Sequence, residues 1–159
     1  MKTFELDFAI RISGYKGKKS DFEPLFKRTI KFLQKNAALN TVASGGQIHL
    51  VLTDDEEISF TNSTYRGEKN STDVISLSYL DEDAYPKDNL IGEVLISVET
   101  ARRQAKEHGK TLTQELRFLF LHGLLHIFGF NHKTAKDRKE MFDLQDEILR
   151  TKSWRKVID

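Results

Sequence analysis

The sequence of 159 residues contains no cysteine, and this absence excludes several kinds of chemistry. Without thiolates the chain has no disulfide framework, no cysteine nucleophile and no sulfur-coordinated zinc site. Any metal site must therefore use nitrogen and oxygen donors. An excess of charge of one sign is also missing, since 25 basic side chains are balanced by 24 acidic ones. This balance does not favour a strongly cationic nucleic-acid binder and leaves only a local basic patch for that purpose.

Long apolar runs are absent as well. No segment approaches the roughly 18 consecutive apolar residues of a membrane-spanning helix. Near the amino terminus, Glu5 and Asp7 interrupt the apolar run that a signal peptide requires. There are only two prolines, and no proline-rich or glycine-rich tract divides the chain. We therefore expect a cytoplasmic protein with one domain over residues 1–159, long enough to enclose a hydrophobic core.

The apolar residues recur with periods that predict strands and helices in mixed order. Alternating or β-branched runs predict strands at residues 4–12, 47–52, 72–79 and 92–97. Helical spacing predicts helices at about residues 21–35, 54–62, 97–109, 113–128 and 135–150. The predicted fold is α+β, an α/β-like sandwich in which one mixed sheet of about four strands packs with about five helices.

Several predicted helices carry recognisable end signals. The residues expected to begin or end them are Ser20 or Asp21, Asp54 with Glu57 as a capping box, Ser97, Gly109 and Thr134. The segment 113–128 is apolar on nearly every side, so we expect it to be a buried helix at the centre of the domain.

The stretch "HGLLHIFGFNH", residues 122–132, carries three of the five histidines. On a helix, His122 and His126 point to the same side, one turn apart. Gly129 can adopt the left-handed conformation that ends a helix and returns His132 toward the other two. Three neutral imidazoles with a fourth position left to water are typical of a catalytic zinc site. The alternative, three histidines gathered by chance, requires the spacing, the glycine and the third histidine all to coincide.

The same spacing occurs in metzincin peptidases, whose pattern is H-E-x-x-H-x-x-G-x-x-H. Their glutamate is the general base, and this chain has Gly123 in its place. A peptidase is therefore a less favoured alternative. Glu115, two turns before His122, could accept a hydrogen bond from a ligand's second N–H or form a structural pair. His49 and His108 are expected to stand outside the site.

Two further blocks accompany the histidine motif, and together the three resemble the YbeY family of bacterial zinc-dependent endoribonucleases and rRNA maturation factors. The block "NSTYRGEKNSTDVISLSY" is similar to the family's asparagine, Tyr-Arg and Thr-Asp-Val segment, and "IGEVLIS" to its Gly-Asp-Ile segment. The resemblance covers about residues 45–150. Asn131 and Glu93 stand where the family usually has aspartate, and we expect these differences to alter the charge around the metal.

The resemblance implies one Zn²⁺ per chain, held by His122, His126 and His132, and assigns the main catalytic role to Arg66. A guanidinium suits that role because it can grip the oxygens on which negative charge builds during phosphodiester cleavage. Asp73 and Ser76 are candidates for orienting Arg66 or for binding substrate in the cleft, although strand-end capping explains them nearly as well.

The implied function is a single-strand-specific metallo-endoribonuclease for ribosomal RNA maturation, including small-subunit rRNA 3′-end processing, and ribosome quality control. Its nucleophile would be a zinc-activated water or the 2′-hydroxyl of the substrate. Its partners would be ribosomal RNA and ribosomal particles, with a ribosomal protein or an assembly GTPase as a further partner, and no membrane. A non-catalytic, zinc-containing ribosome-assembly factor is the alternative from a different class.

Overall fold

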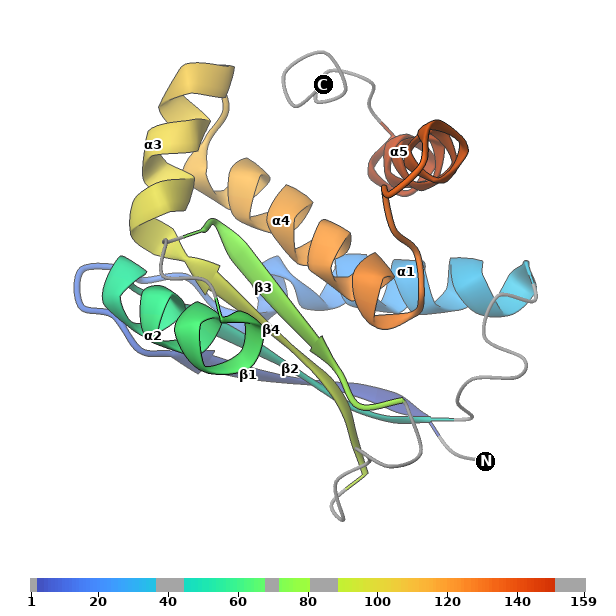
Figure 1. Ribbon diagram of the computed structural model, residues 1–159, viewed down its shortest axis with the longest axis horizontal. Helices are drawn as coiled ribbons and strands as arrows, with labels where there is room; N and C mark the ends of the chain where they lie inside the picture. The colour runs from blue at the N-terminus through green and yellow to red at the C-terminus, as the bar shows by residue number, and fades with distance from the viewer. Residues whose placement is uncertain (1–2, 37–44, 68–71, 81–88, 151–159) are drawn as a thin grey trace.

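The structure is a computed structural model that describes residues 3–36, 45–67, 72–80 and 89–150. Within these ranges the chain forms four strands and five α-helices, which confirms the predicted α+β class (Figure 1). The strands are β1 (Phe4–Ile10), β2 (Gly46–Thr53), β3 (Val74–Ser78) and β4 (Leu90–Ser97). The helices are α1 (Glu23–Lys35), α2 (Asp55–Arg66), α3 (Val98–His108), α4 (Leu112–Ile127) and α5 (Ala135–Leu149).

The strands form one mixed sheet in the order β1-β2-β4-β3. β1, β2 and β4 run parallel, and β3 pairs antiparallel with β4 at the edge of the sheet. Parallel neighbours need a long connection, which α1 supplies between β1 and β2. The predicted mixed sheet is therefore confirmed. Its antiparallel edge strand, β3, begins at Val74, directly after Asp73.

The two faces of the sheet are covered unequally. Alternate residues of a strand point to opposite faces, so Leu50 joins the main core while Val51 points to the other side. Figure 1 shows α4 lying across the sheet with α1 near it. On the opposite face α2 covers a smaller cluster through Ile58, which packs with Ile75 and Leu95. The main core thus lies between the sheet and the helices that surround α4.

α4 is the buried central helix that its composition predicts. Ten of its sixteen residues are buried, so it contacts protein on nearly every side. It begins with a capping box in which the Thr111 hydroxyl accepts from the Gln114 N–H at 3.1 Å and the Gln114 side chain accepts from the Thr111 N–H at 2.9 Å. A Cβ atom at Gly123 would lie 2.8 Å from Cγ1 of Val94, so this glycine lets α4 pack closely on β4.

Most of the predicted helix ends are confirmed. The Ser97 hydroxyl accepts from the Thr100 N–H, the Thr134 hydroxyl accepts from the Asp137 N–H, and Gly109 ends α3 with φ of +65°. Asp54 caps α2 by accepting from the Glu57 N–H at 2.9 Å, but the Glu57 carboxylate is taken by Arg11 and Thr53. The predicted capping box at α2 is therefore only half formed.

Several predicted boundaries differ from the structure. The first strand was predicted over residues 4–12 but ends at Ile10. The amino-terminal cap of α1 is Phe22 rather than Ser20 or Asp21, because residues 19–21 form a separate 3₁₀ turn, η1 (Lys19–Asp21), and a proline lies in the first turn of α1. α2 extends to Arg66, beyond the predicted end near Asn62. It ends there because Gly67 adopts φ of +68° and donates its N–H to the Asn62 carbonyl. Arg66 is thus a helix-terminal residue and does not lie in a loop.

Among the residues that the structure describes, no helix combines the length and the apolar character needed to cross a membrane.

Candidate metal centre

The three histidines of the "HGLLHIFGFNH" motif come together at the end of α4. His122 and His126 lie one turn apart on the helix, and their ring centroids are 4.6 Å apart. Beyond the helix, Gly129 takes φ of +99°, and the Phe130 N–H donates to the Leu125 carbonyl at 3.0 Å. This Schellman-type turn reverses the chain. It brings the ring of His132 to within 5.6 Å of His122 and 5.2 Å of His126, as centroid distances.

The geometry of this cluster fits a metal ion. Each histidine offers one ring nitrogen, and these three nitrogens lie within 4.8 Å of one another. The Nε2 atoms of His122 and His126 are 3.1 Å apart. Two nitrogens bound at about 2.0–2.1 Å in a tetrahedral site would stand roughly 3.3 Å apart, so little movement is needed. With no cysteine in the sequence, the three imidazoles form a donor set of borderline softness that suits zinc and related ions.

Gln145 on α5 fixes the orientation of His122. Its side chain is 2% exposed, and its Oε1 lies 2.7 Å from Nδ1 of His122. Because an amide oxygen only accepts hydrogen bonds, Nδ1 must carry the proton, which leaves the lone pair on Nε2 for a metal. Sequence analysis missed Gln145. Gln145 lies four residues after Met141 and three before Ile148, on the buried face of α5. A polar side chain at this spacing among apolar residues is the sequence feature that could have identified it.

Glu115 does not support the histidine cluster. It is fully buried, and its Oε1 lies 2.5 Å from Nδ1 of His108 on α3. Of the two roles considered from the sequence, the structural pair is the one observed. His108 accordingly stands outside the site, as does His49, whose ring lies between the carboxylates of Asp7 and Glu93 on the sheet.

The surroundings favour the neutral, metal-binding form of His122. Its pKa lies below the ordinary histidine value, chiefly because burial disfavours the imidazolium ion. The charge of His132 lowers this pKa further, whereas the hydrogen bond to Gln145 and the charge of Asp73 raise it. A lowered pKa keeps the ring uncharged at neutral pH, which is the state that a ligand requires.

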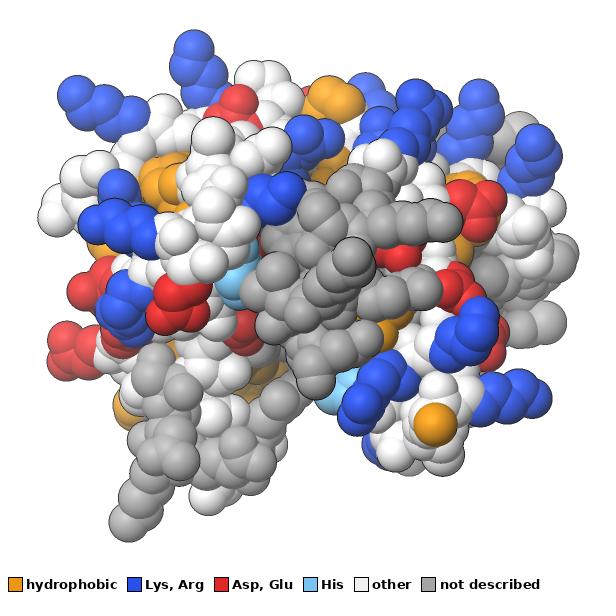
Figure 2. Space-filling view, turned by 90° about the horizontal axis from the view of Figure 1, so that it is seen from above, with side chains coloured by type: hydrophobic (Ala, Val, Ile, Leu, Met, Phe, Trp, Pro, Cys, Tyr) orange, Lys and Arg blue, Asp and Glu red, His pale blue; other side chains and the backbone are white. Residues whose placement is uncertain are grey.

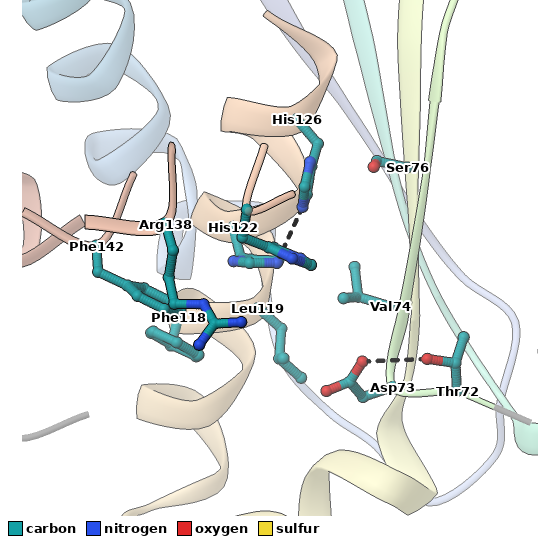
Figure 3. Close-up of a pocket in the computed structure, with 11 residues that line it drawn as sticks. Thr72, Asp73, Val74, Ser76, Phe118, Leu119, His122, His126, Arg138 and Phe142 are labelled. Atoms are coloured by element: carbon teal, nitrogen blue, oxygen red, sulfur yellow. Dashed lines mark hydrogen bonds between the residues drawn. The ribbon is translucent and has the colours of Figure 1, made fainter. Parts of the chain in front are cut away.

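The cluster opens into a cavity of about 410 Å³ between α4, α5 and the edge strand β3 (Figure 3). The structure brings Asp73 and Ser76 into this cavity together with the three histidines. Both come from the segment at and just before β3, and Figure 3 shows them on the wall opposite α4. Asp73 is held in place by the Gln104 amide, which donates to its Oδ2 at 3.2 Å, and by the Thr72 hydroxyl at 3.4 Å.

Arg66 is placed only through its backbone. It is the last residue of α2, six positions before Thr72, which lines the cavity. The side chain of Arg66 lies outside the described part of the structure, so its predicted role stays a prediction.

The two positions that depart from the expected family pattern have different settings. Asn131 precedes His132, and its Oδ1 accepts from the Lys133 N–H at 3.0 Å, which stabilises the turn that presents the third histidine. Glu93 lies on the sheet face opposite the one that Val94 offers to α4, and its Oε2 accepts from the Tyr79 hydroxyl at 3.3 Å. Glu93 therefore does not belong to the immediate surroundings of the histidines, contrary to expectation.

The cavity also contains residues that sequence analysis did not single out. They are Arg138 and Phe142 on α5, Phe118 and Leu119 on α4, and Thr72 and Val74 from the segment around the start of β3. The apolar members read as ordinary core residues in the sequence. Arg138 could not be identified from the sequence, because an arginine in the first turns of an amphipathic helix usually belongs to the solvent-exposed face.

Comparison with known proteins places the chain in a family. The model of the family described as Endoribonuclease YbeY matches residues 9–153. A protein named Endoribonuclease YbeY from Bacillus licheniformis is 42% identical over 127 residues, covering 75% of this chain and 80% of the relative. Its namesake from Moorella thermoacetica is 42% identical over 134 residues, covering 80% of this chain and 86% of the relative.

A solved structure agrees on the fold. The solution structure of TM1509 from Thermotoga maritima has a TM-score of 0.53 and 24% sequence identity, and the match covers 96% of this chain and 91% of that one. With the family model matching nearly the whole chain and relatives at 42% identity, the chain belongs to the YbeY family.

Proposed function

We propose that this protein is a metal-dependent endoribonuclease that cuts single-stranded RNA, with residues 1–159 forming one hydrolase domain. The observation that carries the proposal is the group of three histidines opening into a cavity, in a chain whose relatives are named Endoribonuclease YbeY. Ribosomal RNA in ribosomal particles is the proposed substrate, with processing of the small-subunit rRNA 3′ end and ribosome quality control as the settings. A ribosomal protein or an assembly GTPase is proposed as a further partner, in the cytoplasm.

Zinc is the proposed ion, one per chain, held by His122, His126 and His132. When bound, it would supply Lewis acidity toward the phosphodiester and lower the pKa of water. Gln145 supports this role because it keeps the proton of His122 on Nδ1. The chain's own part is to hold three neutral imidazoles in one place and to leave the side that faces the cavity open to substrate.

Arg66 is proposed to bind the non-bridging oxygens of the scissile phosphate. A guanidinium can donate two parallel hydrogen bonds to them, and these bonds strengthen as negative charge builds. Asp73 and Ser76 are proposed to bind substrate from the opposite wall. The Ser76 hydroxyl can donate to a phosphate oxygen, and the Asp73 carboxylate can accept from a ribose hydroxyl. The hydrogen bond from Gln104 would hold Asp73 in that orientation.

The geometry is compatible with two nucleophiles, and the product ends distinguish them. Attack by the substrate's own 2′-hydroxyl leaves a 2′,3′-cyclic phosphate, with the bond to the 5′-oxygen broken. Attack by water gives ends that carry no cyclic phosphate at any time. We propose water as the nucleophile, and detection of a cyclic phosphate on the initial product would overturn that part of the proposal.

The proposal is tested by incubating a labelled, partly single-stranded rRNA fragment with identically purified proteins. Wild type and His49→Ala are expected to cut at the same sites, whereas His126→Ala and Arg66→Ala are expected to lose the activity. His49 is a matched control because it is a histidine outside the cavity. Equal cutting by all four preparations would mean a contaminating nuclease and would refute the proposal.

A non-catalytic assembly factor is the other outcome to be tested. That function predicts no cleavage by any preparation, together with weaker binding of Arg66→Ala to ribosomal particles. A peptidase is not proposed. Position 123 lacks the glutamate of the metzincin pattern, and a Cβ there would already lie 2.8 Å from Val94. No room exists for that general base without moving the sheet.

A further inference from the structure

Arg138 has a position that the proposed mechanism does not use. It lies in α5, six residues after His132, and its exposed side chain lines the same cavity as the histidines. Figure 3 shows its guanidinium directed into the cavity beside Phe118. Among the described residues, no carboxylate forms a salt bridge with it. A guanidinium that pairs with none of the described carboxylates and points into a cavity is available to an anionic ligand.

The basic residues near Arg138 differ from it. Lys139 is paired with Asp143 at 2.7 Å, and neither Lys133 nor Lys136 lines the cavity. Figure 2 shows lysine and arginine side chains spread over the helical face with acidic side chains among them. Because charges of both signs are mixed on this face, a general electrostatic attraction for RNA is weak. Arg138 therefore differs from the nearby lysines in that its side chain lines the cavity.

One face of α5 presents Arg138 together with two other residues of the site. Residues four and seven positions apart lie along the same side of a helix, so Arg138 shares a face with Phe142 and Gln145. Gln145 holds His122 at 2.7 Å, which ties this face of α5 to the metal ligands. Arg138 is thus placed at a fixed offset from the histidines by a regular helix rather than by a loop.

An apolar wall lies next to the guanidinium. Phe118, Leu119 and Phe142 line the cavity with only 4%, 3% and 8% of their surfaces exposed. Phe118 also stacks on His122, with ring centroids 6.3 Å apart. A cation beside an apolar, largely aromatic surface matches a nucleotide, since the phosphate needs the charge and the base needs an apolar contact.

We propose that Arg138 binds the phosphate of a nucleotide next to the scissile bond, and that the base of this nucleotide packs against the wall of Phe118, Leu119 and Phe142. The inference rests on the proposed endoribonuclease function and assigns it a flanking-nucleotide subsite. Figure 3 supports a flanking rather than a scissile phosphate, because Arg138 lies on the α5 side with Phe118 and Phe142, whereas Ser76 and His126 lie at the other end of the cavity.

The test compares Arg138→Ala with Arg138→Lys and with Lys136→Ala as a matched control on the same helix. A contact made equally in the ground state and the transition state raises KM and leaves kcat unchanged. Loss of one charge-assisted contact should raise KM about tenfold in Arg138→Ala. Arg138→Lys should recover part of the loss, and Lys136→Ala should match wild type. All four proteins should unfold at the same temperature, because both replaced side chains are exposed.

Salt dependence gives a second readout that a structural role would not move. The slope of log kcat/KM against log salt concentration should become shallower by about 0.7 in Arg138→Ala, as expected for one lost phosphate contact on a single strand. A fall in kcat with unchanged KM, or values equal to those of Lys136→Ala, would overturn the inference. If wild type itself failed to cut RNA, the proposed function would fall and this subsite with it, so the two failures are distinguishable.

Discussion

Replacing Gln145 by leucine removes the group that holds Nδ1 of His122, and we expect weaker metal binding as the result. The Gln145 side chain is 2% exposed, and leucine is of similar size, so the helix packing should be kept. What is lost is the hydrogen bond of 2.7 Å that fixes the tautomer and orientation of the ring. Removing such a supporting partner typically lowers metal affinity about 10-fold to 100-fold. This corresponds to about 1.4–2.8 kcal/mol of binding free energy.

The assay is a competition between the protein and a chromophoric chelator for zinc at neutral pH, with wild type, Gln145→Leu and Gln145→Glu. A glutamate keeps an acceptor for Nδ1–H, so Gln145→Glu should bind zinc at least as tightly as wild type. Thermal unfolding of the metal-free proteins controls for loss of structure. Zinc affinity of Gln145→Leu within twofold of wild type would show that the hydrogen bond from His122 to Gln145 does not support metal binding, as would an equal loss in both variants.

Three further predictions concern stability and pH. Gly123→Val should destabilise the fold by about 1–3 kcal/mol in denaturant unfolding, because its Cβ would meet Val94 at 2.8 Å, and a change below about 0.5 kcal/mol would contradict this packing. The pKa of Tyr79 is raised to about 12, mainly by burial and then by Glu93. Between pH 10 and 12 the folded state therefore keeps a proton that the unfolded state loses, so the free energy of unfolding should fall as pH rises over this range. Tyr79→Phe should lose less stability over that range, and an identical pH dependence in both proteins would argue against the assignment. Bound metal should be fully retained after dialysis at neutral pH and lost well below about pH 6. The lowered pKa of His122 should shift the pH of metal loss to a lower value. Full retention of metal at pH 4 would exclude an all-histidine site.

Features that depend on neighbours in the sequence were predictable. The caps at Ser97 and Thr134 and the apolar central helix are local patterns, and all are confirmed. The alternation predicted for residues 4–12 holds only in part, because β1 ends at Ile10 and that side chain is exposed. The convergence of the three histidines could also be predicted from a local sequence pattern. Two of them are fixed by helical spacing, and the turn at Gly129 needs only the conformational freedom of glycine.

Features that depend on packing between distant segments were not predictable. Nothing in the local sequence indicates that Gln145 meets His122, because the contact requires α5 to lie against α4. Glu115 and His108 form their pair only because α3 and α4 lie side by side, and Glu93 turns away from the site because of the register of β4. Such long-range contacts decide which of several plausible polar residues support a site.

The proposed function requires that the histidine cluster hold one metal ion and that RNA cleavage depend on it. The most direct measurement is a titration of zinc into chelator-stripped protein, with the initial rate of rRNA cleavage and the bound metal recorded at each step. We expect a rate that starts near zero, rises in proportion to bound zinc and reaches its maximum at one ion per chain. Full activity in the stripped protein, with no response to added metal, would contradict it.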